Sequence, residues 1–213
     1  MEKEEIGLIL DNQRKFFASG ATKSIEYRLD ILRKLRSVIT SYDSDIKKAL
    51  WDDLHKPEFE AMATETGFVL KELNHTIRRL RGWARRRRVR TPVVHFIAKS
   101  HVIPNPYGQV LVLSPWNFPF QLALLPVIGA LAAGNCVVLK VSRQVPETNK
   151  IIKKILEHFP PELLTIFNGN HDVSEYLLNH KFDYIFFTGS TRIGRYVMEK
   201  AAANLTPVSL ELG

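Results

Sequence analysis

A turn of small polar residues between Tyr184 and Gly194 is the stretch of this sequence best suited to chemistry. Its sequence is YIFFTGSTRIG. The aromatic and β-branched residues at its start indicate a short buried strand, and Ser190 or Thr191 can cap a following helix. Free backbone N–H groups and the positive end of the helix dipole would then face one spot, which favours a phosphate. An ordinary connection between a strand and a helix needs the same residue types.

Other polar residues also follow apolar runs along the chain. Each of these residues stands at or near the end of a run rich in Val, Ile, Leu or Phe: Asn117, Lys140, Asn168 and Glu211. In open parallel sheets, ligands bind outside the carboxyl ends of the strands. If the runs are parallel strands, these side chains meet the 189–190 turn at one edge of a sheet. We therefore expect a binding site at that edge.

The elements that must position these residues alternate regularly from Gln109 onward. Five short apolar segments indicate strands that are buried on both faces: 109–114, 136–141, 163–167, 184–188 and 208–212. Helical patterns separate them at 120–133, 147–158, 172–179 and 191–204. This alternation predicts an α/β fold, a Rossmann-like parallel sheet of about five strands with right-handed crossover helices.

Residues 1–90 are expected to form a layer of helices ahead of this sheet. Apolar residues recur at helical spacing in several groups between Ile6 and Leu80. Residues 91–107 break this pattern with alternating apolar residues and prolines, which favours an extended arm or hairpin. Such an arm needs a pairing partner, either its own sheet or a partner subunit. Residues 108–213 form the expected α/β core.

The composition is that of an ordinary globular protein of 213 residues, with 45% hydrophobic and 24% charged residues. A single cysteine, Cys136, excludes an internal disulfide and favours a reducing compartment. The acidic start lacks the features of a signal peptide, so a cytoplasmic location is expected. Segment 100–139 carries no Asp, Glu, Lys or Arg, but prolines and glycines interrupt it, and we expect no membrane segment.

The positive charge is concentrated in one place. The net charge is +8, and eight arginines lie between Arg78 and Arg90 without an acidic residue among them. A solvated helix end explains such a cluster. The alternative is a non-catalytic module that binds a nucleotide or nucleic acid through these arginines. No helix-turn-helix, zinc-finger or RNA-binding pattern accompanies them, so nucleic acid is the less favoured partner.

Several common catalytic patterns are missing. The seven histidines show no pair at metal-ligand spacing, and the single cysteine offers no second thiolate, so no zinc site is expected. The sequence has no Gly-x-Ser-x-Gly elbow, no P-loop and no Gly-x-Gly-x-x-Gly fingerprint. These absences argue against zinc enzymes, serine hydrolases and P-loop enzymes.

From Gln109 onward, however, the sequence resembles the aldehyde dehydrogenase superfamily. The matching blocks are SPWNFP (114–119), PVIGALAAGN (126–135), VVLK (137–140), FTGSTRIG (187–194) and LELG (210–213). Several blocks in this order are far more specific than one short motif. The closing AAANLTPVSLELG is most similar to the class 3 branch, whose substrates are fatty and aromatic aldehydes. The resemblance implies the amino-terminal, dinucleotide-binding half of an enzyme that oxidises aldehydes to carboxylic acids with NAD or NADP.

The resemblance implies two catalytic residues in this chain. Asn117 matches the asparagine whose side-chain amide stabilises an oxyanion, and Glu211 matches the general base that activates the hydrolytic water. The family's nucleophile is a cysteine beyond the Glu-Leu-Gly block, whereas this sequence ends at Gly213. Cys136 begins a buried strand and is expected in the core. We therefore expect the catalytic domain to be absent and the chain alone to be inactive.

The resemblance also implies cofactor-binding residues. Lys140 matches the lysine that binds the adenosine ribose, Gly189 and Ser190 match the turn at the pyrophosphate, and Ile193 packs nearby. After Lys140 the sequence is Val-Ser-Arg, where family members commonly have Pro, a small residue and Glu. That glutamate binds the 2′-hydroxyl of NAD, whereas Arg143 can accept the 2′-phosphate of NADP. We expect NADP to bind at least as well as NAD, with a solvated loop cation as the alternative for Arg143.

The expected partners are a nicotinamide cofactor, an aldehyde in the full-length enzyme, and a second copy of the chain. Without the carboxyl half, apolar surface would be exposed, so a homodimer or other self-association is expected. Neither a membrane nor a nucleic acid is an expected partner.

Overall fold

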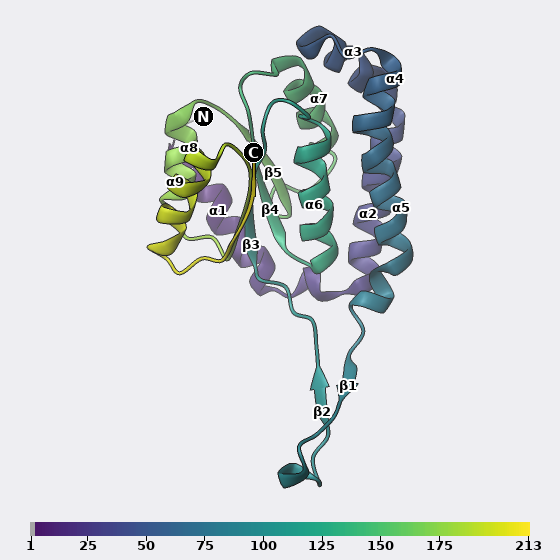
Figure 1. Cartoon of the computed structure of the whole chain (residues 1–213), viewed down its shortest axis with the longest axis vertical. Helices are drawn as coiled ribbons and strands as arrows, with labels where there is room; N and C mark the ends of the chain where they lie inside the picture. Colours follow the sequence, from purple (N-terminus) through teal and green to yellow (C-terminus); the bar gives the residue numbers. More distant parts are fainter. Residues whose placement is uncertain (1–2) are drawn as a thin grey trace.

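The computed structural model describes residues 3–213 and contains a five-stranded parallel sheet (Figure 1). The strands lie in the order β5-β4-β3-β6-β7, and each neighbouring pair is parallel. Their bounds are Gln109–Leu113 (β3), Cys136–Val141 (β4), Leu164–Asn168 (β5), Tyr184–Gly189 (β6) and Val208–Leu212 (β7). The predicted α/β fold with about five parallel strands is confirmed.

The central strand, β3, fixes where the other strands end. All five of its residues are buried. Its last residue, Leu113, lies opposite Lys140 on β4 and Phe187 on β6, and Phe187 lies opposite Leu210 on β7. The chain runs from β3 to β4 and β5 on one side and returns to β6 and β7 on the other side. The strand order therefore reverses beside β3, which is the usual position of a ligand site in such sheets.

Four crossover helices connect these strands: α6 (Gln121–Ala133), α7 (Pro146–Leu156), α8 (His171–Leu178) and α9 (Thr191–Ala202). Their ends follow from local sequence. The Ser190 side chain accepts a hydrogen bond from the Ile193 N–H at the start of α9, and Asn170 caps α8 in the same way. Gly134 ends α6 with a φ of 92°, which a residue with a side chain rarely adopts.

Helices α1 to α5 precede the sheet, with bounds Lys3–Ala18 (α1), Ile25–Ser41 (α2), Asp43–Leu54 (α3), Glu58–Ala61 (α4) and Gly67–Trp83 (α5). Ala21–Lys23 is a short 3₁₀ turn. Met62–Thr66 is a π-helical turn between α4 and α5. A π turn holds one residue more than an α turn, so it rotates the residues before it relative to those after it.

These helices lie on both faces of the sheet (Figure 1). One hydrophobic cluster joins α2, α5, α6 and α7 to the sheet through residues such as Leu35, Leu73 and Val127. The other cluster joins α1, α8 and α9 to the opposite face through residues such as Ile6 and Val197. The helices before the sheet therefore form two layers and not the single layer that we expected. Helical periodicity shows that one side of a helix is buried, but not which face of a sheet covers it.

The chain between α5 and β3 forms a hairpin that extends beyond the body of the molecule (Figure 1). β1 (Arg87–Val89) pairs with β2 (Ser100–Val102) in antiparallel fashion, and a 3₁₀ turn at Val93–His95 lies between them. We call residues 87–102 the arm. The apolar side chains around its turn are 79–87% exposed: Val93, Val94, Phe96 and Ile97.

Within residues 3–213, no helix combines the length and apolar character that crossing a membrane requires. The uncharged segment 100–139 instead supplies β2, β3, α6 and the first part of β4. Its longest helix, α6, has 13 residues and contains Pro126.

Gly67 provides a test of the π turn. Its N–H donates to the carbonyl oxygen of Met62, and a Cβ at Gly67 would lie 2.5 Å from that oxygen, whereas a Cβ at Gly82 would meet nothing within 4 Å. We predict that Gly67→Ala lowers the free energy of unfolding by about 1–3 kcal/mol, since the backbone must shift. Gly82→Ala, on the same helix, should raise it by up to about 1 kcal/mol. Urea unfolding followed by circular dichroism measures both; equal stabilities would contradict the tight contact.

Candidate functional site

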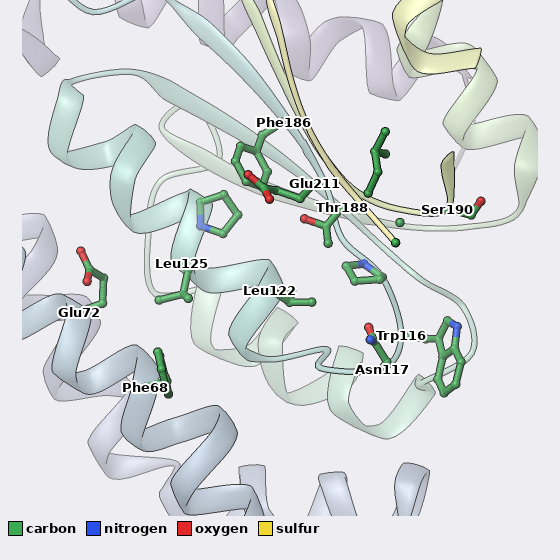
Figure 2. A pocket seen from close by; sticks show the side chains of 15 residues that line it. Phe68, Glu72, Trp116, Asn117, Leu122, Leu125, Phe186, Thr188, Ser190 and Glu211 are labelled. Atoms are coloured by element: carbon green, nitrogen blue, oxygen red, sulfur yellow. The ribbon is translucent and has the colours of Figure 1, made fainter. Parts of the chain in front are cut away.

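A pocket of about 850 Å³ opens where β6 and β7 end, between the sheet and helices α5 and α6 (Figure 2). Most of its wall is apolar, formed by Phe68, Leu122, Leu125, Pro126 and Phe186. Polar side chains also line it: Glu72, Asn117, Thr188, Ser190 and Glu211. A largely apolar cavity with a few polar groups is typical of a site for a small molecule.

Several residues that the sequence predicted for a site line this pocket together. Asn117 lies on the loop from β3 to α6, Gly189 and Ser190 form the turn from β6 to α9, and Glu211 lies on β7. The loops after β3 and β6 flank the point where the strand order reverses. Glu211 lies opposite Thr188 in the sheet and its side chain is exposed. The expected convergence of these four residues is therefore present.

Lys140 ends at the same edge of the sheet but on the other face, outside the pocket. On β4, Leu139 packs in the cluster with α6, whereas Val138 packs in the cluster with α8 and α9. Because side chains alternate along a strand, Lys140 lies on the α9 face. On β7, Leu210 packs in the cluster with α9, so Glu211 lies on the α6 face. The two predicted site residues are thus on opposite faces of one edge.

Two cations lie together at the end of β4. Burial lowers the pKa of the Lys140 ammonium, and the charge of Arg143 lowers it further. Arg143 itself is exposed in the turn before α7. An anion bound beside both groups would offset their repulsion. Like Lys140 and Arg143, Ile193 on α9 is not one of the residues that line the pocket.

The turn before α9 combines a glycine with a capping serine. A Cβ at Gly189 would lie 2.6 Å from the outermost ring carbon of Phe187, two residues earlier, so a larger residue there requires that ring to move. Ser190 already caps the Ile193 N–H. The N–H groups of the two residues before it, 191 and 192, have no partner within the helix. Together with the helix dipole, they can bind an anion.

Our sequence analysis missed two buried charged residues beside the Asn117 loop. Glu65, on the π turn, is 0% exposed, and its Oε1 accepts a hydrogen bond from Lys56 Nζ at 2.5 Å. Its Oε2 accepts from the backbone N–H groups of Phe120 at 3.1 Å and Gln121 at 2.8 Å, where α6 begins. Lys56 Nζ also donates to the carbonyl oxygen of Asn117 at 2.9 Å. The pair therefore ties the π turn to the loop that carries Asn117.

A signal for this pair was present in the sequence. Glu65 lies three residues after Met62 and four before Val69, within the apolar stripe of its helix. A carboxylate at such a position is rare unless it is paired. Burial raises the pKa of the Glu65 carboxyl, and hydrogen bonds from Lys56 and the α6 backbone oppose that shift.

Cys136 is completely buried at the start of β4. Burial, with a smaller contribution from Glu162, raises the pKa of its thiol to about 12. A thiol in this state is not a nucleophile at neutral pH, as expected for a core residue. Among residues 3–213, no group of three or more His, Cys, Asp or Glu side chains is arranged to hold a metal ion.

Comparison with known proteins identifies the family. The model of the aldehyde dehydrogenase family matches residues 1–213. The 4,4'-diaponeurosporen-aldehyde dehydrogenase of Staphylococcus aureus is 40% identical over 203 residues, which cover 95% of this chain and 44% of that protein. Aldehyde dehydrogenase family 3 member B1 of Bos taurus is 40% identical over 205 residues, covering 96% of this chain and 44% of that protein.

Solved structures share the fold. The substrate-bound state of Staphylococcus aureus AldH superposes with a TM-score of 0.96 at 39% identity, over 98% of this chain and 46% of that one. Betaine aldehyde dehydrogenase from the same species, in complex with NAD+, superposes with a TM-score of 0.88 at 25% identity, over 99% of this chain and 42% of that one. The chain spans a little less than half the length of these relatives. It belongs to the aldehyde dehydrogenase family, and its relatives place it in the class 3 branch.

Proposed function

We propose that this chain is the nicotinamide-cofactor-binding part of an aldehyde dehydrogenase that oxidises an aldehyde to a carboxylic acid. The observation that carries the proposal is the pocket in which Asn117, Glu211 and the Gly189–Ser190 turn meet. Membership of the family supports the same reaction. Residues 108–213 are the proposed cofactor-binding core.

The residues at the carboxyl edge fit a dinucleotide that crosses from one face of the sheet to the other. The Gly189–Ser190 turn leads into the first turn of α9, whose N–H groups can bind a pyrophosphate. Lys140, on the α9 face, is available to the adenosine ribose. The pocket on the α6 face is available to the other end of the cofactor, which supplies the hydride acceptor when it is bound.

Asn117 and Glu211 have complementary roles in this proposal. The side-chain amide of Asn117 donates a hydrogen bond to the oxyanion that develops on the aldehyde oxygen, which stabilises the tetrahedral state. The Glu211 carboxylate accepts a proton from the water that releases the acid. The apolar wall that includes Phe68, Leu122 and Phe186 contacts the carbon chain of the aldehyde and excludes water.

Cofactor choice gives a direct test of the edge residues. We predict that Arg143→Ser weakens NADP+ binding about tenfold or more, because a charged hydrogen bond contributes about 1.5–3 kcal/mol, and leaves NAD+ binding nearly unchanged. Lys140→Ala should weaken both cofactors, since both carry the adenosine ribose. Isothermal titration calorimetry measures these affinities, with NADP+ expected to bind at least as well as NAD+.

Arg85→Ser, within the arginine cluster, is the control for this experiment and should leave both affinities unchanged. A wild-type chain that binds neither cofactor, or binding that is lost only in Arg85→Ser, would contradict the proposal. Because the buried Cys136 cannot supply a thiolate, the 213-residue polypeptide should not reduce bound cofactor when an aldehyde is added. Absorbance of the reduced nicotinamide measures that reaction.

The arm is the proposed site of self-association. Its two strands pair with each other and with no other strand among the described residues, and its apolar side chains face solvent. An exposed apolar hairpin of this kind favours pairing with another chain. Part of the arginine cluster is engaged within the chain itself, where Arg81 pairs with Glu26 at 2.5 Å and Arg86 lies 2.8 Å from His101 Nδ1. These contacts occupy two of the eight arginines of the cluster within the chain itself.

Removing the apolar tip of the arm tests this proposal. We predict that the double substitution Phe96→Ser and Ile97→Ser reduces the fraction of dimer or larger species at least severalfold, because the buried apolar area of the contact is lost. Multi-angle light scattering measures the mass. Leu205→Ser removes another apolar side chain, 91% exposed outside the arm, and should have no effect. If the wild-type chain is a monomer at all concentrations, the arm does not mediate self-association in this polypeptide.

A further inference from the structure

We propose that Lys56 and Glu65 are positioning residues that hold the backbone of Asn117 so that its side chain faces the pocket. This inference rests on the proposed function, because it gives Asn117 its role there. The contacts themselves are independent of that function. They connect Lys56, just before α4, and Glu65, on the π turn, to the segment between β3 and α6, across 55 to 61 residues of sequence.

Glu65 links two helices at their ends. The π turn places its carboxylate in the interior, where one oxygen accepts from Lys56 and the other accepts from two N–H groups at the start of α6. Those N–H groups belong to the first turn of α6, which lacks intrahelical acceptors. Glu65 therefore acts as the acceptor for the α6 terminus, although it lies 55 residues before Phe120 in the sequence.

Lys56 extends this network to the residue that faces the pocket. Its side chain is 8% exposed, and Nζ divides its contacts between Glu65 Oε1 and the Asn117 carbonyl oxygen. The same ammonium lies 3.9 Å from the centre of the Phe118 ring, a cation–π contact. One cation thus contacts both the backbone of Asn117 and the side chain of Phe118. Pro115 and Pro119 restrict the remaining freedom of the loop.

Asn117 has few contacts of its own that could hold it in place. Among the hydrogen bonds of the described residues, the bond from Lys56 is the only side-chain hydrogen bond to residue 117. Trp116 and Asn117 are themselves exposed, so packing does not immobilise them. Figure 2 shows both side chains on the loop, with Asn117 at the pocket. In this proposal, the fixed conformation of the exposed Asn117 depends on the buried Lys56–Glu65 ion pair.

The charge-balanced double substitution Lys56→Met and Glu65→Gln tests the inference. Removing one partner alone leaves a buried charge unpaired and is strongly destabilising, whereas removing both charges avoids that penalty. The Glu65→Gln change keeps a side-chain oxygen that can accept from Phe120 and Gln121, so the α6 terminus retains its acceptor. What is lost is the donor to the Asn117 carbonyl oxygen. The matched control is Lys150→Met with Glu147→Gln, an exposed ion pair of 2.6 Å on α7.

The readout is the order parameter of the Asn117 backbone N–H from ¹⁵N relaxation. We expect about 0.85 in the wild type and in the control, and a fall below about 0.6 in the double variant. Hydrogen exchange at Phe120 and Gln121 should stay within about tenfold of wild type, which separates loss of positioning from general loosening. An unchanged Asn117 value in a folded double variant would overturn the inference.

The wild-type measurement decides the question even if the double variant does not fold. An Asn117 N–H that is already mobile in the wild type, with an order parameter below about 0.6, would show that the pair does not position it. The readout requires neither cofactor nor aldehyde. Failure of the wild-type chain to bind NAD+ or NADP+ would therefore refute the proposed function separately from this inference.

Discussion

The parallel register of five strands around β3 is the constraint on which the rest of the structure depends. It places Lys140, Leu113, Phe187 and Leu210 in one row, and their four strands all end at this row or within two residues after it. The loops that follow these strands therefore lie over the carboxyl edge of the sheet. The pocket exists because two of these loops diverge where the strand order reverses. Burial of apolar side chains on both faces maintains that register.

Most of the sheet could be predicted from the sequence because its strands are short apolar runs separated by amphipathic helices. The segments 136–141 and 208–212 were predicted with the bounds that the structure shows. The loop and turn residues at the strand ends were also predicted, since parallel strands that end together bring their following residues together. Asn117, Ser190 and Glu211 meet in one pocket for this reason. The roles of these residues come from the family resemblance and remain proposals.

Other features depend on contacts that a sequence pattern does not contain. The amphipathic pattern of α1 is similar to that of α2, yet α1 covers the opposite face of the sheet. Lys140 and Glu211 were expected at one rim. The alternation of side chains along β4 and β7, read from the neighbours that pack in each cluster, shows that they lie on opposite faces. The apolar stripe marks Glu65 as a buried carboxylate, but its partners depend on a π turn, which changes the direction of a helix face by an amount that regular periodicity cannot give. The residues that the Lys56–Glu65 pair contacts lie 55 to 61 positions later in the chain.

The central claim is that one dinucleotide crosses the carboxyl edge of this sheet and uses both of its faces. A crystal structure of the chain grown with NADP+ tests this most directly. The account predicts the adenosine on the α9 face beside Lys140, the pyrophosphate at the start of α9, and the nicotinamide in the pocket with Asn117 and Glu211. A cofactor bound entirely on one face, or bound at the arm and its arginines, would contradict it.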